Sequence, residues 1–427
     1  MEQKKNYAIP IAMMFMLFFM VAFVTNLAAP MGVILKEQFG ASNFAAALGN
    51  AANFIAYAFM GLPAGILLKK VGYKKTALLA VSVGFVGVGI QYLSGQMESF
   101  SVYLIGAFIA GFSMCLLNTV VNPMLNTLGG GGNKGNQLIQ IGGSLNSVAA
   151  TIVPVLVGIF IGENIKEATV VDANPVILTA MGIFALTFVI LLSVNIPEPG
   201  LAASRIEKGD KYGPMSFRHF VFGAGAIFCY VGIEVGIPQF VNYYMTAGVD
   251  AGGLGISTAI AGTVAGTYWF LMMLGRIFGA GLASKFSAKT MMSCASTVAI
   301  IFVLLGVFLP DTMTVDMPVF NSDLSFGLSE VPMGVMFFVL CGLCTSVMWG
   351  GIFNLAVEGL GKYTEKASGI FMVMVCGGGI LPLVQGLVAD QTSSFLMSYW
   401  VVVAALGYLF YFAQIGCKNV NKDIPVD

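Results

Sequence analysis

A single acidic residue inside a long apolar run is the strongest candidate for chemistry in this sequence. Glu234 lies near the middle of residues 218–246, away from the charged residues that flank the run. A charge at the centre of a bilayer costs about 2.5–3.5 kcal/mol on insertion scales, so such a residue is protonated, paired or beside a watery cavity. We expect Glu234 to bind substrate or a proton; a structural hydrogen bond to a neighbouring helix is the alternative.

The residues around Glu234 extend this candidate site along one helix. Tyr230 and Pro238 lie one helical turn to either side and share its face, and Gln239 adds a polar group further along. Proline removes a backbone donor, so we expect Pro238 to kink the helix and expose backbone groups to a ligand.

Uncharged amides form the second candidate feature. Asn118, Asn122 and Asn126 follow one another at intervals of four residues, which places them on one face of a helix. Asparagine supplies both donors and acceptors, which suits a polyhydroxylated ligand. Hydrogen bonding between helices is an equally weighted alternative. Further amides lie inside apolar runs, at Asn26, Asn50, Asn53, Gln140, Asn146, Asn354 and Gln385.

The shortage of buried charge favours a neutral polar solute over an anionic one. An anion would require a buried Arg or Lys, and only Arg276 comes near, at the end of its run. The ring of Trp349 lies within another run and is a candidate surface for the C–H face of a sugar. Packing in the core or against lipid is the alternative for that ring.

The composition explains why these residues lie in apolar surroundings. Of 427 residues, 58% are hydrophobic and only 9% are charged, against about 25% charged in a soluble domain. Lipid must therefore solvate much of the surface. The formal net charge is zero, which gives no reason to expect nucleic-acid binding.

Metal and enzymatic chemistry find little support in the sequence. Cys341 and Cys344 form a C-x-x-C inside an apolar run, where packing is the favoured interpretation. The one histidine, His219, cannot build a metal site, and we interpret it as an interfacial residue. No nucleophile–base pair is recognisable. We therefore expect neither an enzyme nor a protein with a cofactor or metal.

Twelve apolar runs have the length that crosses a bilayer, about 20 residues each. Helices are expected because unpaired backbone groups are excluded from lipid. The runs are 9–35, 44–68, 76–95, 100–127, 137–162, 175–196, 218–246, 255–284, 290–309, 331–358, 367–389 and 395–415.

The basic residues predict the orientation. With twelve spans, 18 of the 20 Lys and Arg residues fall on the side of both termini, which predicts cytoplasmic termini. The lack of any N-x-S/T site agrees with the inner membrane of a bacterium. We assign gating or structural roles to the charged residues at the inner ends of spans, namely Lys69, Lys70, Arg276, Lys285 and Glu358.

The two halves of the chain resemble each other. Ile152-Val-Pro154 with Gly158 matches Ile380-Leu-Pro382 with Gly386, and two further short matches occur in the same order. This pattern predicts a parallel repeat with a substrate site between the halves. We divide the chain into a six-helix bundle at 1–196, a cytoplasmic linker at 197–217 and a second bundle at 218–427.

The order of motifs resembles the major facilitator superfamily and, within it, the fucose–galactose–glucose/proton symporters. The stretches that carry this resemblance are Pro63–Lys70 with Tyr73-Lys74, Asn122-Pro123 with Leu128-Gly129, Tyr230–Glu234 with Phe240–Tyr243, and Gly359–Thr364 with Gly378–Pro382 and Ala389-Asp390. Two positions depart from the pattern of these relatives. Residues 31–35 lack the acid of the first span, and Asn118 stands where relatives carry Glu.

The resemblance implies an all-α membrane protein with the major facilitator fold, twelve transmembrane helices in two pseudo-symmetric bundles. It implies import of a small neutral sugar such as fucose, glucose or galactose by alternating access, with Glu234 as the remaining candidate proton carrier. Sugar uniport and export of amphipathic molecules are the alternatives. We expect a monomer whose partners are the sugar, protons and the lipid bilayer. The expected substrate-binding residues are Asn26, Asn53, Asn118, Asn122, Asn146, Tyr230, Glu234, Gln239, Trp349 and Asn354.

Overall fold

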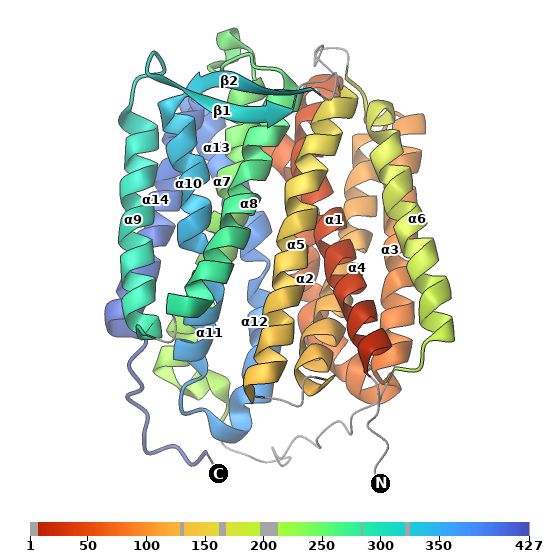
Figure 1. Ribbon diagram of the computed structural model, residues 1–427, viewed down its shortest axis with the longest axis vertical. Helices are drawn as coiled ribbons and strands as arrows, with labels where there is room; N and C mark the ends of the chain where they lie inside the picture. Colours follow the sequence, from red (N-terminus) through yellow and green to blue (C-terminus); the bar gives the residue numbers. More distant parts are fainter. Residues whose placement is uncertain are drawn as a thin grey trace.

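Long helices that stand nearly side by side make up most of the protein (Figure 1). The computed structural model describes residues 7–128, 132–161, 168–196, 212–282, 285–320 and 325–426. Within these residues, twelve helical spans are long and apolar enough to cross a membrane, which confirms the number expected from the sequence. The predicted span 218–246 agrees with the observed helix at both ends.

The first half of the chain forms six of these spans. Their bounds are α1 (Ala8–Phe39), α2 (Asn43–Val71), α3 (Tyr73–Gln96), α4 (Phe100–Leu128), α5 (Gly132–Ile161) and α6 (Asn174–Ser193). The second half begins with α7 (Arg218–Thr246), α8 (Thr258–Leu282) and α9 (Ala288–Phe308). It continues with α10 (Met333–Thr345), α11 (Met348–Val357), α12 (Thr364–Met374), α13 (Gly377–Thr392) and α14 (Phe395–Tyr411).

Two spans of the second half are interrupted, each forming a pair of shorter helices. The tenth span breaks between α10 and α11, and the eleventh breaks between α12 and α13, just before Gly377. The helix that holds Pro238 stays continuous. The kink expected at Pro238 therefore stays a prediction, and the interruptions of helices occur in other spans.

A β-hairpin follows α9, in the stretch between the expected spans 290–309 and 331–358, where the sequence analysis predicted no regular structure. β1 (Thr314–Phe320) pairs antiparallel with β2 (Phe326–Pro332). Met317, Val319 and Val331 are buried on one face of the hairpin. The hairpin lies across one end of the bundle, and the chain ends lie at the other (Figure 1). We call these ends the hairpin side and the terminal side.

The helices before and after residues 197–211 lie on opposite sides of Figure 1, in warm and cool colours. This arrangement is compatible with the two bundles expected from the sequence. Most of the expected linker, 197–211, lies outside the described residues. The division at 197–217 therefore stays a prediction.

Glycines bring the two halves into direct contact at matched positions. A Cβ on Gly386 in α13 would lie 2.9 Å from the Asn43 carbonyl oxygen at the start of α2. A Cβ on Gly158 in α5 would clash with the Thr258 carbonyl oxygen at the start of α8. Gly158 and Gly386, which correspond in the sequence repeat, thus make corresponding contacts: each packs against the start of a helix in the opposite half. Both contacts occur at the hairpin ends of their helices.

Candidate functional site

Glu234 lies in a polar network inside the bundle rather than in contact with lipid. Its Oε1 accepts a hydrogen bond from the Tyr230 hydroxyl at 2.9 Å and lies 3.5 Å from Arg276 Nη2. The two charged side chains keep 15% and 18% of their surface exposed, although α7 and α8 are the most enclosed of the spans.

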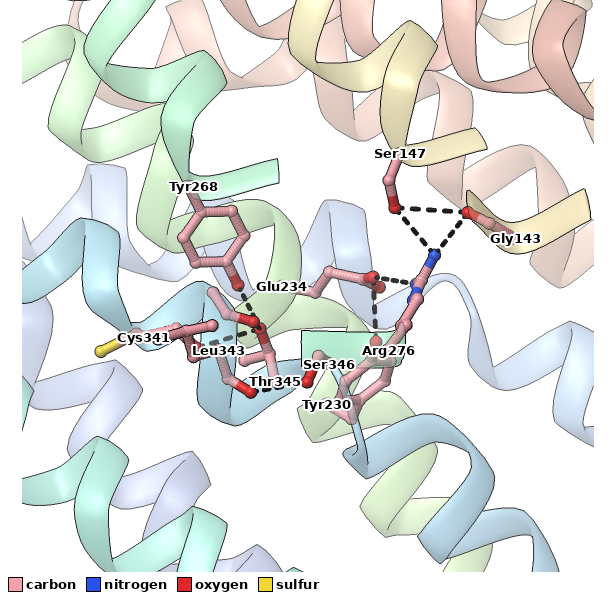
Figure 2. A network of polar contacts seen from close by, with 11 residues as sticks. Gly143, Ser147, Tyr230, Glu234, Tyr268, Arg276, Cys341, Leu343, Thr345 and Ser346 are labelled. Atoms are coloured by element: carbon pink, nitrogen blue, oxygen red, sulfur yellow. Dashed lines mark hydrogen bonds and ion pairs between the residues drawn. The ribbon is translucent and has the colours of Figure 1, made fainter. Parts of the chain in front are cut away.

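Arg276 connects this network to the other half of the protein. Its Nη1 donates to the Gly143 carbonyl oxygen at 2.9 Å and to Ser147 Oγ at 3.0 Å, both on α5. Figure 2 shows the side chains of Glu234, Arg276 and Ser147 pointing toward one another. One guanidinium thus contacts the acid in its own half and the backbone of the opposite half.

The location of the guanidinium differs from the sequence expectation. The backbone of Arg276 does lie near the end of α8, as expected for a residue at the cytoplasmic boundary. A helical side chain, however, points back toward the N-terminus of its helix. Because α8 begins on the hairpin side, the long side chain of Arg276 reaches toward the middle of the bundle. Arg276 is therefore part of the site, not only a residue at its edge.

Aromatic residues surround the charged pair. The rings of Tyr230 and Trp349 lie 6.0 Å apart, and Trp349 is half-buried. Tyr268 is fully buried, and its hydroxyl lies 2.9 Å from Thr345 Oγ1 (Figure 2). Two of the ten expected substrate residues, Tyr230 and Glu234, are hydrogen-bonded to each other, and Trp349 borders them.

The asparagines of α4 form a second polar group in the first half. Asn118 Nδ2 donates to the Tyr57 hydroxyl at 2.9 Å, and Asn122 Nδ2 donates to the Asn118 carbonyl oxygen at 3.0 Å. Both asparagines are half-buried. The side chain of Asn126, the third member of the predicted stripe, lies outside the described residues. These contacts leave carboxamide acceptors on both residues for further hydrogen bonds.

The remaining expected substrate residues are not gathered at the charged pair. Asn26 donates to the Ala22 carbonyl oxygen of its own helix at 2.9 Å. Asn146 is half-buried beside Ser147, and Asn354 is exposed. Asn53 is buried, and neither of its amide atoms has a hydrogen-bond partner.

Gln239 has a different environment from the one expected. It is fully buried, accepts from Asn50 Nδ2 at 2.7 Å and donates to the Tyr243 hydroxyl at 3.1 Å. Because Asn50 belongs to α2, Gln239 joins the two halves in this conformation. Its side chain forms a contact between the halves, and its role in substrate binding stays a prediction.

The charged residues assigned to gating lie mostly at the surface. Lys69, Lys70 and Lys285 are exposed on the terminal side. Glu358 is also exposed, and its backbone carbonyl oxygen lies 2.9 Å from Nε2 of the buried His219. Only Arg276 of this group lies in the candidate site.

Several residues of the site escaped the sequence analysis. Ser147 and Gly143 meet Arg276, and Tyr57 meets Asn118. Small polar residues and tyrosines are common in membrane helices, so their types alone did not separate them from packing residues. No cluster of three or more potential metal ligands occurs in the described part of the chain.

Comparison with known proteins agrees with this architecture. The sequence profile of the Major Facilitator Superfamily matches residues 13–383. The chain belongs to the Major Facilitator Superfamily. It is a multi-pass membrane protein of a family of transporters, not of enzymes, as the order of its motifs indicated.

Similar members of the superfamily cover nearly the whole chain. A glucose/galactose transporter of Brucella abortus is 27% identical over 98% of this chain and 96% of its own length. The L-fucose-proton symporter of Escherichia coli is 24% identical over 98% and 96%. The crystal structure of an E. coli fucose:proton symporter variant aligns with a TM-score of 0.67 at 21% identity, over 97% of this chain and 100% of that one. This similarity confirms the major facilitator fold.

Proposed function

We propose that this protein imports a small neutral sugar across the cytoplasmic membrane by alternating access. The observation that supports this most is the Tyr230–Glu234–Arg276 network, because it combines hydrogen-bond donors and acceptors in helices of both halves with side chains that are mostly buried yet still partly exposed. The full-length relatives named for glucose/galactose and L-fucose transport point to a monosaccharide.

The charge of the site favours a neutral solute. Arg276 is the buried cation that an anionic solute would require, but Glu234 lies 3.5 Å away and balances its charge. A hexose would instead use hydroxyl groups to bind the carboxylate, the guanidinium and the carboxamides of Asn118 and Asn122. The Trp349 ring, beside Tyr230, offers an apolar surface for the sugar's C–H face.

Glu234 is the proposed proton carrier. Protonation would remove the attraction between its carboxylate and Arg276, while Arg276 would keep its hydrogen bonds to Gly143 and Ser147 on α5. The contact between α7 and α8 would then weaken, and the contact between the two halves would remain. A proton could in this way change the shape of the site without direct contact with the sugar.

Uniport is the second candidate, and the same ion pair is the reason. A carboxylate that already has a cationic partner is stable without taking up a proton. The chain also lacks acids at residues 31–35 and at Asn118. Export of an amphipathic compound is less well supported, because the amides and the charged pair make the site polar.

Uptake into proteoliposomes tests these proposals. Purified protein should take up one or more sugars from a panel of radiolabelled monosaccharides, and an inward proton gradient should increase the rate. We expect Glu234→Gln to abolish the increase, because glutamine cannot exchange a proton. Glu330→Gln, which changes an exposed acid in β2, is the matched control and should respond like the native protein.

The outcomes separate the candidates. Uniport is established if the proton gradient does not change the uptake rate of either the native protein or Glu234→Gln. Failure to take up any sugar of the panel, with folded protein in the vesicles, rejects the sugar assignment.

A further inference from the structure

The carboxylate of Asp390 binds the start of a helix in the opposite half. Asp390 lies near the hairpin end of α13, and its two oxygens accept from the backbone N–H groups of Asn43 and Phe44, each at 2.9 Å. These are the first two residues of α2. We call this pair of hydrogen bonds the Asp390 cap. It joins residues that are more than 340 positions apart in the chain.

The Asp390 cap completes the hydrogen bonding at the start of α2. The first N–H groups of a helix have no partner within the helix. The Ser42 Oγ accepts from Ala45 N at 3.1 Å, so the N–H group of the third residue has a partner next to its own helix. The N–H groups of the first two residues have Asp390 as their partner. A carboxylate at this position also benefits from the positive end of the helix dipole.

The helices α13 and α2 pack closely around the Asp390 cap. Gly386, one turn before Asp390, lies directly against the backbone of Asn43 and Phe44, where a Cβ would be 2.9 Å from both. Nearby, Lys36 Nζ donates to Asn43 Oδ1 at 2.8 Å and lies 5.0 Å from the centre of the Phe395 ring in α14. Two turns further along α2, Asn50 Nδ2 donates to Gln239 Oε1 on α7 at 2.7 Å.

The corresponding contact between α5 and α8 has a weaker polar component. There Gly158 packs against the start of α8, and Thr258 Oγ1 lies 3.3 Å from the Gly158 carbonyl oxygen. Among the described residues, no carboxylate is recorded at this second contact. The two matched contacts therefore both join the halves on the hairpin side, and one of them contains a charged, solvent-exposed group.

We propose that Asp390 is a gating residue whose cap on α2 stabilises the conformation closed on the hairpin side. Opening that side requires α2 and α13 to separate, which breaks both hydrogen bonds and leaves two N–H groups and a carboxylate without their partners. This inference rests on the proposed alternating access, but it is independent of the identity of the solute and of any proton coupling.

Hydrogen–deuterium exchange of the full-length protein in lipid nanodiscs, without sugar, tests the gate. In Asp390→Asn we expect the hairpin-side segments 154–161 and 239–246 to exchange about tenfold faster, the size expected for lost hydrogen bonds to a charged group. Neither segment contains a hydrogen-bond partner of the Asp390 carboxylate, whose oxygens bind Asn43 and Phe44. The terminal-side segments 65–71 and 276–282 should exchange more slowly, because alternating access closes one side as the other opens.

Two matched variants separate gating from local effects. Ser42→Ala removes the other side-chain acceptor at the start of α2 without touching α13, so it should affect residues 41–47 alone. Asp311→Asn removes another acid on the hairpin side, whose hydrogen-bond partner at 2.8 Å, Tyr244, lies in the same half. This variant should change the exchange rate on neither the hairpin side nor the terminal side.

Two results would overturn the gate. In one, Asp390→Asn changes only residues 41–47, as Ser42→Ala does, which shows a local cap. In the other, exchange is unchanged throughout. Because no sugar is present, neither exchange result bears on the sugar assignment. A failed uptake assay likewise does not bear on the exchange result.

Discussion

Glu234 and Arg276 depend on each other because each would be costly alone inside the bundle. Their side chains are 3.5 Å apart and mostly buried. Removing one member of a buried pair leaves an uncompensated charge, whereas replacing both removes the charge altogether. The stability of the protein should therefore show strong coupling between the two positions.

A double-mutant cycle measures that coupling. We expect Glu234→Gln and Arg276→Gln each to destabilise the protein by about 3 kcal/mol, and the double variant to cost clearly less than the sum of the two. The readout is the melting temperature in detergent. Additive losses would mean that the charges are stabilised separately by water.

The backbone near Glu234 adds a further polar group. Pro238 has no N–H, so the Glu234 carbonyl oxygen lacks its usual helical donor four residues on. The helix nevertheless continues to Thr246. The proline thus frees a hydrogen-bond acceptor beside the site without breaking the helix.

At the scale of elements, three consecutive glycines let α13 pack closely against one helix of its own half and one of the opposite half. Gly377 meets the backbone of Phe228 in α7, while a Cβ on Gly379 would lie 2.8 Å from the Ala51 carbonyl oxygen in α2. The same glycines begin α13, directly after the break in the eleventh span. They allow one helix to pack closely against two others, as small residues do in membrane helices.

Gly379→Ala should disturb this junction. The added methyl group would push α13 away from α2, and we expect a loss of about 1–3 kcal/mol, seen as a lower melting temperature and reduced uptake. Gly407→Ala is the control, because a Cβ there meets nothing within 4 Å. Equal behaviour of the two variants would show that the close approach has no energetic importance.

At the scale of the whole molecule, the distribution of basic residues predicts orientation in the membrane. The exposed Lys69, Lys70 and Lys285 all lie on the terminal side. Retention of basic loops in the cytoplasm should place that side inside the cell. The hairpin, with Asp316 and Glu330 as cross-strand partners, would then face outward.

Labelling of single introduced cysteines checks the orientation. In intact cells, a membrane-impermeant maleimide should modify Asp316→Cys and fail to modify Lys285→Cys; both positions are exposed. Inverted vesicles should give the opposite result. The unmodified protein, which contains seven cysteines of its own, sets the background. Labelling of Lys285→Cys in intact cells would reverse the assigned topology.

Much of the fold could be derived from the sequence because crossing a bilayer is a local requirement. About 20 apolar residues must lie in one stretch, so the spans could be located without knowledge of their neighbours. The same rule drew attention to Glu234, since a carboxylate within such a stretch stands out. The hairpin was missed because its seven-residue strands are too short and too polar to show this pattern.

The partners of the site residues were decided only by the tertiary structure. Arg276 lies 42 positions from Glu234 and over 120 from Ser147, and nothing in the local sequence indicates that its guanidinium meets these two residues. Asp390 likewise reads as a residue at the end of a span until α13 meets α2. Hydrophobic length is a property of one segment, whereas a salt bridge or a helix cap depends on where distant segments pack. For this reason the sequence determined the helices and the tertiary structure determined the network and the gate.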